Sequence, residues 1–404
     1  MTNPVRLVLV GMGGMGSVYL DELLRHEARS DFRLIGAVDP KPEKCPRLEE
    51  LRRLGIPIFP SLEEFYRAQD AELAILASPI HLHAPQTCLA LDRGSHVLCE
   101  KPVAATIQEA IAMLQAEKKA GKRVAVGYQW SFSDAVQKLK KDIQLGIFGR
   151  PRRLKCLYLW PRDLAYYRRN DWAGRKKDKV GRWVLDSPAH NAMAHDLHNM
   201  LYILGPTRET SARPANVEAE LYRAFPIENF DTAALRILTE EGTEILFYVS
   251  HASAMDTGPV FDYEFEFGRI ETRGRNAPIK ARSVKGEIID YGSPDSQPLK
   301  KMWDALDMAK SDTPPACGIE AATSQTLCLN GAQESMPEIV DFPRTLLRHR
   351  QEGDKITITV EGLEEALIKA YEKNLLPFEL GVSWSKKGKV IDLTNYHYFP
   401  SKAQ

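Results

Sequence analysis

The sequence predicts an α/β fold in two parts: an N-terminal, doubly wound parallel sheet and a C-terminal α/β domain on a large, mostly antiparallel open sheet. Three observations predict it. The 404-residue length suits two domains better than one compact layer. Short apolar runs alternate with amphipathic segments up to about residue 127. Beyond residue 150, segments of alternating polarity follow one another with few helices between them. We therefore expect domains over residues 1–127 and 128–404, with a tail from about residue 341.

The apolar runs place the elements of the N-terminal domain. Gly94 and Gly121 stand where glycines end helices, because glycine adopts the left-handed conformation without strain. The expected strands are residues 5–10, 34–38, 73–77, 96–99 and 123–126. The expected helices lie at about residues 15–28, 61–69, 84–93 and 106–120.

The second domain is expected to begin with strands and to end with a mixed tail. Strands are expected at residues 231–239, 244–250 and 261–267, framed by helices at about 190–204 and 318–335. The tail is expected to contain a strand at 355–360, a helix at 363–374 and a coil rich in aromatic residues. The sequence assigns this tail no role.

Composition excludes several classes of protein. The 54 Lys and Arg residues balance 54 Asp and Glu residues, which argues against generic nucleic-acid binding. The apolar run at residues 5–10 is short and ends in glycines, so we expect neither a signal peptide nor a membrane span. The six cysteines form no CxxC pair, which indicates reduced thiols in a cytoplasmic protein.

A glycine-rich loop follows the first expected strand and opens a helix. Such a GxGxxG loop provides a tight turn, close approach of the backbone to a pyrophosphate and close packing of helix on strand. Asp39 ends the second strand 23 residues after the last glycine; it would bind the adenosine ribose hydroxyls and repel a 2′-phosphate. NAD is therefore expected rather than NADP, although Lys41 and Lys44 would soften the repulsion. The alternative is a turn that binds no ligand. The loop residues are Gly11, Met12, Gly13, Gly14, Met15 and Gly16.

The segment Cys99-Glu100-Lys101-Pro102 directly follows the expected strand at 96–99. Together with the GxGxxG loop, VDP after the second strand and ASPIHLH after the fourth, it makes the chain resemble the glucose–fructose oxidoreductase/inositol dehydrogenase/rhizopine-catabolism family (Gfo/Idh/MocA) over roughly residues 5–336. The resemblance implies an NAD(P)-dependent oxidoreductase that acts on a sugar, cyclitol or related polyol. It also implies a Rossmann domain, and a second domain whose open sheet often forms the interface of a homo-oligomer.

Lys101 is the first candidate catalytic residue. It lies at the carboxyl end of a parallel strand, where open α/β sheets bind ligands, and an ammonium there would stabilise the alkoxide that develops as hydride leaves. The alternative is a solvated surface lysine. Glu100 and the loop residues Ser78, Pro79 and His83 are expected beside the cofactor, although His83 is explained equally well as a cap of the following helix.

The family usually carries a DxGxH motif at the start of a helix in its second domain. This chain has Asp186-Ser-Pro-Ala-His190, which keeps the spacing but has Pro188 in place of the glycine. When residues are counted forward from Asp186, His190 matches the family's catalytic histidine. When they are counted backward from Gly205, where the helix is expected to end, His195 is the closer match. Either imidazole would accept the hydroxyl proton near neutral pH. Asp186 would hold the imidazole tautomer or bind a second hydroxyl.

On the expected helix, Asn191, His195, His198 and Tyr202 share one face, which we expect to line a cleft. His198 is better explained as a buried, hydrogen-bonded histidine than as a catalytic one. The histidines and aspartates lack the spacing of a metal site, and nicotinamide chemistry with a lysine and a histidine needs no metal, so none is expected.

A basic segment with interleaved aromatic residues lies between the two motifs. Residues 150–182 hold twelve Lys and Arg against three Asp, a local charge of +9. The segment is explained equally well as a solvated loop, as an oligomer contact or as part of the site; facing the cleft, it would favour an anionic sugar. The candidates for substrate binding are Tyr128, Trp130, Arg162, Arg169, Asn170, Trp172, Asn191 and His198.

Two other functions would use the same residues. In a redox-neutral glycosidase, NAD oxidises a ring hydroxyl, the aglycone leaves by elimination, and NADH returns the hydride. A non-catalytic sensor of NAD or sugar is the third possibility, against which the presence of Lys101, Asp186 and a histidine argues.

Overall fold

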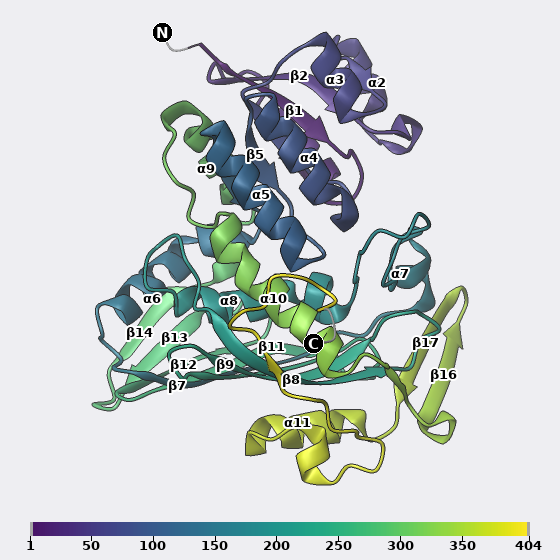
Figure 1. Ribbon diagram of the computed structural model, residues 1–404, viewed down its shortest axis with the longest axis vertical. Helices are drawn as coiled ribbons and strands as arrows, with labels where there is room; N and C mark the ends of the chain where they lie inside the picture. Colours follow the sequence, from purple (N-terminus) through teal and green to yellow (C-terminus); the bar gives the residue numbers. More distant parts are fainter. Residues whose placement is uncertain (1–2, 402–404) are drawn as a thin grey trace.

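The computed structural model describes residues 3–401, which form a six-stranded sheet, a ten-stranded sheet and a two-stranded hairpin. Figure 1 shows the six-stranded sheet at one end of the molecule and the larger sheet lying across the other end. The first sheet is parallel and the second is mostly antiparallel, so the predicted mixed α/β fold is confirmed. Among the described residues, no helix combines the length and the apolarity that crossing a bilayer requires.

The six-stranded sheet has the order β3-β2-β1-β4-β5-β6, which reverses between β1 and β4. In such doubly wound sheets the ligand crevice lies at the carboxyl ends of the strands, beside this reversal. The strands are β1 (Val5–Val10), β2 (Phe32–Val38), β3 (Ile58–Phe59), β4 (Leu73–Leu76), β5 (His96–Cys99) and β6 (Val124–Val126). The helices are α1 (Met15–Arg25), α2 (Leu48–Arg53), α3 (Leu62–Ala68), α4 (Ile80–Asp92) and α5 (Ile107–Ala120).

Local sequence signals explain where two helices of this sheet begin and end. Helix α5 begins at a capping box, in which the Glu109 carboxylate accepts the Thr106 backbone N–H at 2.9 Å, and it ends at Gly121 with φ of 61°. Helix α4 begins at Ile80, four residues before the expected start at 84. Pro85 lies inside the helix, where its missing N–H removes one backbone hydrogen bond without preventing the first turn.

The larger sheet has the order β14-β13-β12-β11-β7-β10-β9-β8-β15, and β18 pairs with β8. Its central strand, β7, lies within the basic segment of residues 150–182, where no strand was expected. Leu154 and Cys156 are buried in β7, while the neighbouring Arg153 and Lys155 hide the apolar alternation in the sequence. The strands are β7 (Pro151–Leu159), β8 (Pro214–Arg223), β9 (Thr232–Thr239), β10 (Glu244–Ser250), β11 (Thr257–Phe265), β12 (Gly268–Arg273), β13 (Ile279–Ser283), β14 (Ile288–Gly292), β15 (Val340–Asp341) and β18 (Ile391–Asp392).

Helices separate the large sheet from the parallel sheet. Figure 1 shows α6 (Asp134–Gln144), α8 (Ala194–Ile203) and α10 (Ile319–Ser335) on the face toward the parallel sheet, and α9 (Lys300–Ser311) packs against β5. The short α7 (Leu164–Arg168) follows β7. The expected helix at 190–204 consists of two segments, because a π-helical turn at Pro188–Ala192 precedes α8.

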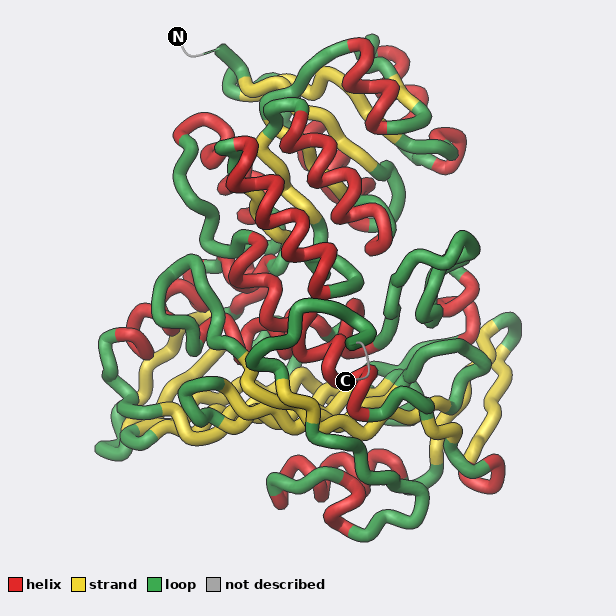
Figure 2. The backbone as a smooth tube through the Cα atoms, viewed as in Figure 1, coloured by secondary structure: helices red, strands yellow, loops and turns green. Residues whose placement is uncertain are grey.

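The C-terminal tail covers part of the opposite face of the large sheet. Figure 2 shows strands of this sheet with helices on both sides. The tail contains the hairpin of β16 (Leu347–Glu352) and β17 (Lys355–Val360), followed by α11 (Leu363–Lys373). Leu363 and Leu367 of α11 pack in one apolar cluster with Tyr222 and Tyr248 of the sheet.

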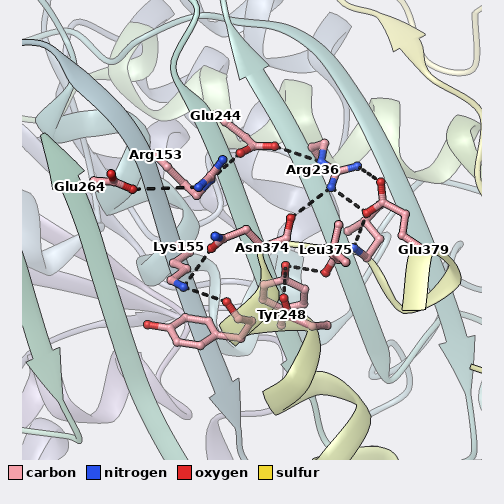
Figure 3. A network of polar contacts seen from close by, with 12 residues as sticks. Arg153, Lys155, Arg236, Glu244, Tyr248, Glu264, Asn374, Leu375 and Glu379 are labelled. Atoms are coloured by element: carbon pink, nitrogen blue, oxygen red, sulfur yellow. Dashed lines mark hydrogen bonds and ion pairs between the residues drawn. The ribbon is translucent and has the colours of Figure 1, made fainter. Parts of the chain in front are cut away.

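Polar contacts fix the tail at the rim of this cluster (Figure 3). The Lys155 ammonium donates to the Tyr371 carbonyl at 2.8 Å and to Asn374 Oδ1 at 2.9 Å, at the C-terminal end of α11. The Arg236 guanidinium of β9 donates to both carboxylate oxygens of Glu379, at 2.8 and 2.7 Å. The tail is therefore built into the fold as a third layer.

Candidate functional site

The glycine loop after β1 has the three properties expected of a phosphate-binding turn. A Cβ on Gly11, whose φ is +84°, would lie 2.7 Å from the Ala77 carbonyl oxygen, and a Cβ on Gly16 would lie 1.9 Å from the Gly11 carbonyl oxygen. Gly11 thus allows the turn, and Gly16 lets α1 pack closely. A Cβ on Gly13 would meet no atom within 4 Å, so this glycine faces open space at the N-terminus of α1.

Asp39 lies beside this loop at the end of β2. Its Oδ2 accepts the Met12 N–H at 2.9 Å and its Oδ1 accepts the Lys41 N–H at 2.8 Å. These bonds fix the carboxylate against the glycine loop. The contact expected between Asp39 and an adenosine ribose stays a prediction.

The loop after β4 is joined to the loop after β5 by His83. This buried side chain lies inside α4 with Nδ1 2.7 Å from the Pro102 carbonyl oxygen and Nε2 2.9 Å from the Ser78 carbonyl oxygen. Burial lowers its pKa below 6.5. Because Pro79 is the N-cap residue and receives no side-chain bond, the expectation that His83 caps the helix was wrong.

Glu100 is buried in a network that reaches a distant helix. Its Oε1 accepts the Tyr19 hydroxyl and the Lys301 ammonium, both at 2.5 Å, and Lys301 also donates to the Gly127 carbonyl at 3.1 Å. Lys301 belongs to α9 and is 1% exposed. Burial acts to raise the pKa of Glu100, but the Lys301 ammonium outweighs it and holds this pKa below its usual range. The pair is therefore ionised and links α9 to the loop that carries Lys101.

Lys101 is held next to the Asp186 motif. Its Nζ donates to the Asn191 carbonyl at 2.7 Å and to Asn191 Oδ1 at 2.9 Å. Asn191 Nδ2 in turn donates to Asp186 Oδ1 at 2.8 Å, and the backbone N–H of Gly174 donates to Asp186 Oδ2 at 2.7 Å. Burial lowers the pKa of Lys101 to about 8 and raises that of Asp186. The two sequence motifs, about 90 residues apart, thus meet in one polar chain.

The two candidate histidines have different environments. His190 lies in the π-helical turn and is 0% exposed; burial lowers its pKa to about 3, and neither ring nitrogen has a hydrogen-bond partner among residues 3–401. His195 lies in the first turn of α8, is partly exposed, and packs its ring edge-on to Tyr128 and tilted to Trp130. Burial, followed by the positive charge of Lys101, lowers the pKa of His195 well below 6.5. His195 is therefore neutral near pH 7 and accessible.

The expected polar face of this helix is largely covered. The His198 ring stacks on Tyr128 with centroids 3.8 Å apart, and its Nε2 lies 3.0 Å from Ser131 Oγ. His198 and Tyr202 are buried, so the cleft-lining prediction fails at these two positions. The Tyr128 hydroxyl donates to Gln325 Oε1 at 3.0 Å. The Trp130 indole donates to Asp295 Oδ1 at 2.7 Å.

The aromatic and basic segment after β7 reaches the same site. Arg169 Nη2 lies 4.0 Å from Asp186 Oδ2. Asn170 Oδ1 accepts the backbone N–H groups of Trp172 and Ala173 at 3.1 and 2.7 Å, which shapes the turn after α7. Trp172 packs beside an apolar cluster that includes Ile80 at the start of α4. This segment therefore spans from the large sheet to the carboxyl edge of the parallel sheet.

Sequence reasoning missed Lys301 and Tyr19, the partners of Glu100. Lys301 did carry a weak indication, because with Ala305 and Met308 it follows the i, i+4, i+7 spacing of the buried face of α9. A lysine on the buried face of a helix usually pairs with a carboxylate or belongs to a functional site. Nothing in the sequence indicates that Lys301 pairs with Glu100, which lies 201 residues away.

Comparison with known proteins agrees with this geometry. The sequence model of the Gfo/Idh/MocA family, described as an oxidoreductase family with an NAD-binding Rossmann fold, matches residues 5–128. Residues 5–128 thus match the NAD-binding Rossmann domain of the Gfo/Idh/MocA family. The match covers the whole parallel sheet, from β1 to β6, and the Lys101 loop. NAD is accordingly the cofactor of this part of the chain.

Curated family members extend the similarity. Inositol 2-dehydrogenase 4 from Saccharopolyspora erythraea is 31% identical over 155 residues, 38% of this chain and 45% of that enzyme. Inositol 2-dehydrogenase from Rubrobacter xylanophilus is 24% identical over 297 residues, 73% of this chain and 76% of that enzyme. The chain thus spans less than half the length of the first of these relatives.

Solved structures share the fold over most of the chain. The WlbA dehydrogenase from Bordetella pertussis, solved with NADH and UDP-GlcNAcA, has a TM-score of 0.67 at 20% identity and covers 82% of this chain and 96% of its own. Levoglucosan dehydrogenase, solved with NADH, has a TM-score of 0.68 at 17% identity, with coverages of 82% and 96%. At these identities the similarity shows a shared fold.

Two glycine substitutions should separate cofactor binding from folding. Gly13→Ala is expected to leave the melting temperature near that of the wild type and to weaken NAD binding by about tenfold or more, because its methyl group enters the open space needed by the pyrophosphate. Gly16→Ala is expected to lower the melting temperature, since its Cβ overlaps the Gly11 carbonyl. Thermal unfolding and NAD titration measure both effects. Unchanged NAD affinity in Gly13→Ala would contradict the role given to this loop.

Proposed function

We propose that this chain is an NAD-dependent dehydrogenase that transfers a hydride between nicotinamide and a hydroxyl or keto carbon of a sugar, cyclitol or sugar derivative. One observation carries the proposal. The Lys101 ammonium, fixed by Asn191, and the neutral, accessible His195 occur together beside the carboxyl edge of an NAD-binding sheet. A lysine and a neutral histidine are the two groups that proton transfer during alcohol oxidation requires.

The cofactor would lie along the carboxyl edge of the parallel sheet. Gly11–Gly16 and Asp39 are suited to its adenosine and pyrophosphate parts, because Gly13 leaves the N-terminus of α1 open. The loops of Ser78–Pro79, His83 and Glu100 are suited to its nicotinamide half. When bound, NAD supplies the hydride acceptor. The chain's own residues orient the substrate and move its proton.

Lys101 would stabilise the substrate oxygen. An ammonium has three N–H donors, and two of them are used by Asn191, so one remains for a substrate hydroxyl. As hydride leaves the carbon, negative charge develops on that oxygen, and the fixed ammonium stabilises it. Asn191 and Asp186 position the ammonium, because Asp186 holds the Asn191 side chain by its amide group.

His195 would accept the hydroxyl proton, in preference to the fully buried His190. We expect His195→Gln to lose most of kcat, because the amide cannot act as a base, while His190→Gln keeps the larger fraction of activity. Protonation removes the base as the pH falls, and the pKa of His195 lies well below 6.5, so the acidic fall in kcat/KM belongs well below pH 6.5. A pH profile of both variants measures this. Full activity in His195→Gln would assign the base elsewhere.

The activity itself is tested with purified protein, NAD and a panel of sugars, cyclitols and glycosides. NADH formed in equal amount to oxidised product is the expected result. Release of an aglycone without net NADH would instead identify the redox-neutral glycosidase. Absence of any turnover over the whole panel, with NAD still bound, would favour a sensor.

A further inference from the structure

Guanidinium groups and aromatic rings alternate in a continuous series beside the Lys101 site. The Arg169 guanidinium lies 3.8 Å from the centre of the Tyr166 ring, and Arg162 lies 4.6 Å from the centre of the same ring. Arg162 also lies 3.6 Å from the centre of the Trp160 ring, and Arg275 lies 4.7 Å from that ring. We call Arg169, Arg162 and Arg275, with the two rings between them, the arginine series.

The arginine series begins at the proposed reaction site. Arg169 Nη2 lies 4.0 Å from Asp186 Oδ2, and Asp186 is joined through Asn191 to the Lys101 ammonium. The charge of Arg169 is also one of those that lower the pKa of Lys101, which places the two cations near each other. A substrate held by Lys101 therefore has the series beside it, on the Asp186 side.

The three arginines differ in how their charges are balanced. Arg275 donates to Asp256 Oδ1 at 2.6 Å, and Arg169 has Asp186 at 4.0 Å. Arg162 has no carboxylate within 4.0 Å among residues 3–401, and its Nε is buried without a hydrogen-bond partner in that range. Arg162 therefore carries a positive charge that no carboxylate of the described residues balances at contact distance.

A partly buried guanidinium without a partner is unfavourable unless a ligand completes it. Loss of water destabilises the charged group, and this burial lowers the pKa of Arg162. The Trp160 and Tyr166 rings pack against the guanidinium and restrict its orientation. A planar, fixed fork of N–H donors matches the two oxygens of a carboxylate or phosphate.

We propose that Arg162 and Arg169 bind an anionic group, a carboxylate or a phosphate, carried by the sugar or cyclitol substrate. The proposal rests on the proposed dehydrogenase function and specifies its substrate class. Arg162 supplies the unpaired charge. Arg169 supplies a second donor group nearer the reacting carbon, with Nη1 already fixed by the Tyr166 carbonyl at 2.5 Å.

Matched substrates test the proposal by turnover. Glucose, glucuronate and glucose 6-phosphate form one set, and inositol with an inositol monophosphate forms a second; each is assayed by NADH formation. We expect the wild type to prefer an anionic member, and Arg162→Met to reduce the anionic-to-neutral ratio of kcat/KM by about 100-fold. Arg162→Lys, which keeps the charge but not the fork, should lie between them. The carboxylate and phosphate arms show which anion the site takes.

Arg168→Met is the matched control, because Arg168 is an exposed arginine at the end of the neighbouring helix α7 and lies outside the arginine series. Arg168→Met should keep the wild-type anionic-to-neutral ratio of kcat/KM. Equal kcat/KM for neutral and anionic members in the wild type, or an equal loss for both in Arg162→Met, would overturn the proposal while the dehydrogenase function stands.

A binding measurement keeps the test independent of turnover. The NAD-loaded wild type, Arg162→Met and Arg168→Met are titrated calorimetrically with glucuronate, glucose 6-phosphate and glucose, after their melting temperatures have been compared. Stronger binding of an anion than of glucose, lost only in Arg162→Met, supports the proposal even if no NADH forms. Anion binding that is absent, or identical in all three proteins, overturns it.

Discussion

Replacement of Lys101 by methionine is expected to lower kcat by about 10³-fold while NAD binds as tightly as in the wild type. The methionine side chain has a similar length but no N–H donor, so the developing alkoxide loses its charged partner. The two acceptor oxygens of Asn191 lose their donor as well, while the bond from the Asn191 amide to Asp186 remains. Steady-state kinetics on the best substrate of the panel measures the loss.

The Lys101→Met experiment needs NAD titration and thermal unfolding as controls. The lost hydrogen bonds should lower the free energy of unfolding by only about 1–3 kcal/mol, so the variant remains folded during the assay. Lys101→Arg tests whether charge alone suffices; we expect it to stay well below wild-type activity, because the guanidinium cannot occupy the same place between the Asn191 oxygens. A kcat near that of the wild type in Lys101→Met would exclude the role proposed for this residue.

Replacement of Lys301 by methionine should give the largest loss of stability. The substitution leaves the Glu100 carboxylate buried with the Tyr19 hydroxyl and one backbone N–H, but without its cation. Breaking a buried ion pair from one side costs about 3–5 kcal/mol in free energy of unfolding. Denaturant unfolding at pH 7 measures this. Wild-type stability in Lys301→Met would show that Glu100 does not depend on the pair.

The pH dependence of the Lys301 effect has a definite sign. In the wild type the pKa of Glu100 is lowered, so the pair stabilises the fold above the unfolded pKa and this contribution is lost as the pH falls through the folded pKa. In Lys301→Met the buried carboxylate has lost its ion-pair partner, so its pKa rises and acid protonates it at less cost. The stability difference between the two proteins should therefore shrink at acidic pH. The double variant Glu100→Gln/Lys301→Met removes both charges and should recover most of the loss.

The parallel sheet was predictable because its strands are buried on both faces. Short, mostly apolar runs such as Val5–Val10 and His96–Cys99, followed by turn signals, indicate buried strands, and the structure has the same bounds. The large sheet was predicted only in part. Its central strand β7 contains Arg152, Arg153 and Lys155, whose charged ends reach the rim of the outer face or the tail, and so it has the composition of a loop.

The site was predictable where its chemistry is local in sequence. The glycine loop and the Lys101 loop each follow a strand, and the structure brings both to one edge of the sheet. The choice between His190 and His195 was not predictable, because the π-helical turn at Pro188–Ala192 shifts the count from the motif to the end of the helix. Partners far apart in the chain, such as Glu100 with Lys301, depend on the final packing.

The tail covers an apolar area on the outer face of the large sheet, which affects how copies of this chain could associate. The side chains of Tyr222 in β8 and Tyr248 in β10 are buried under the tail, a segment of the same polypeptide. Tyr248 packs against Tyr371 of α11, and Tyr222 packs against Phe342 and Trp384. A surface of this kind usually has to be hidden between subunits. Here the tail of the same chain covers that area. The tyrosine rings therefore stay buried whatever the number of copies that associate.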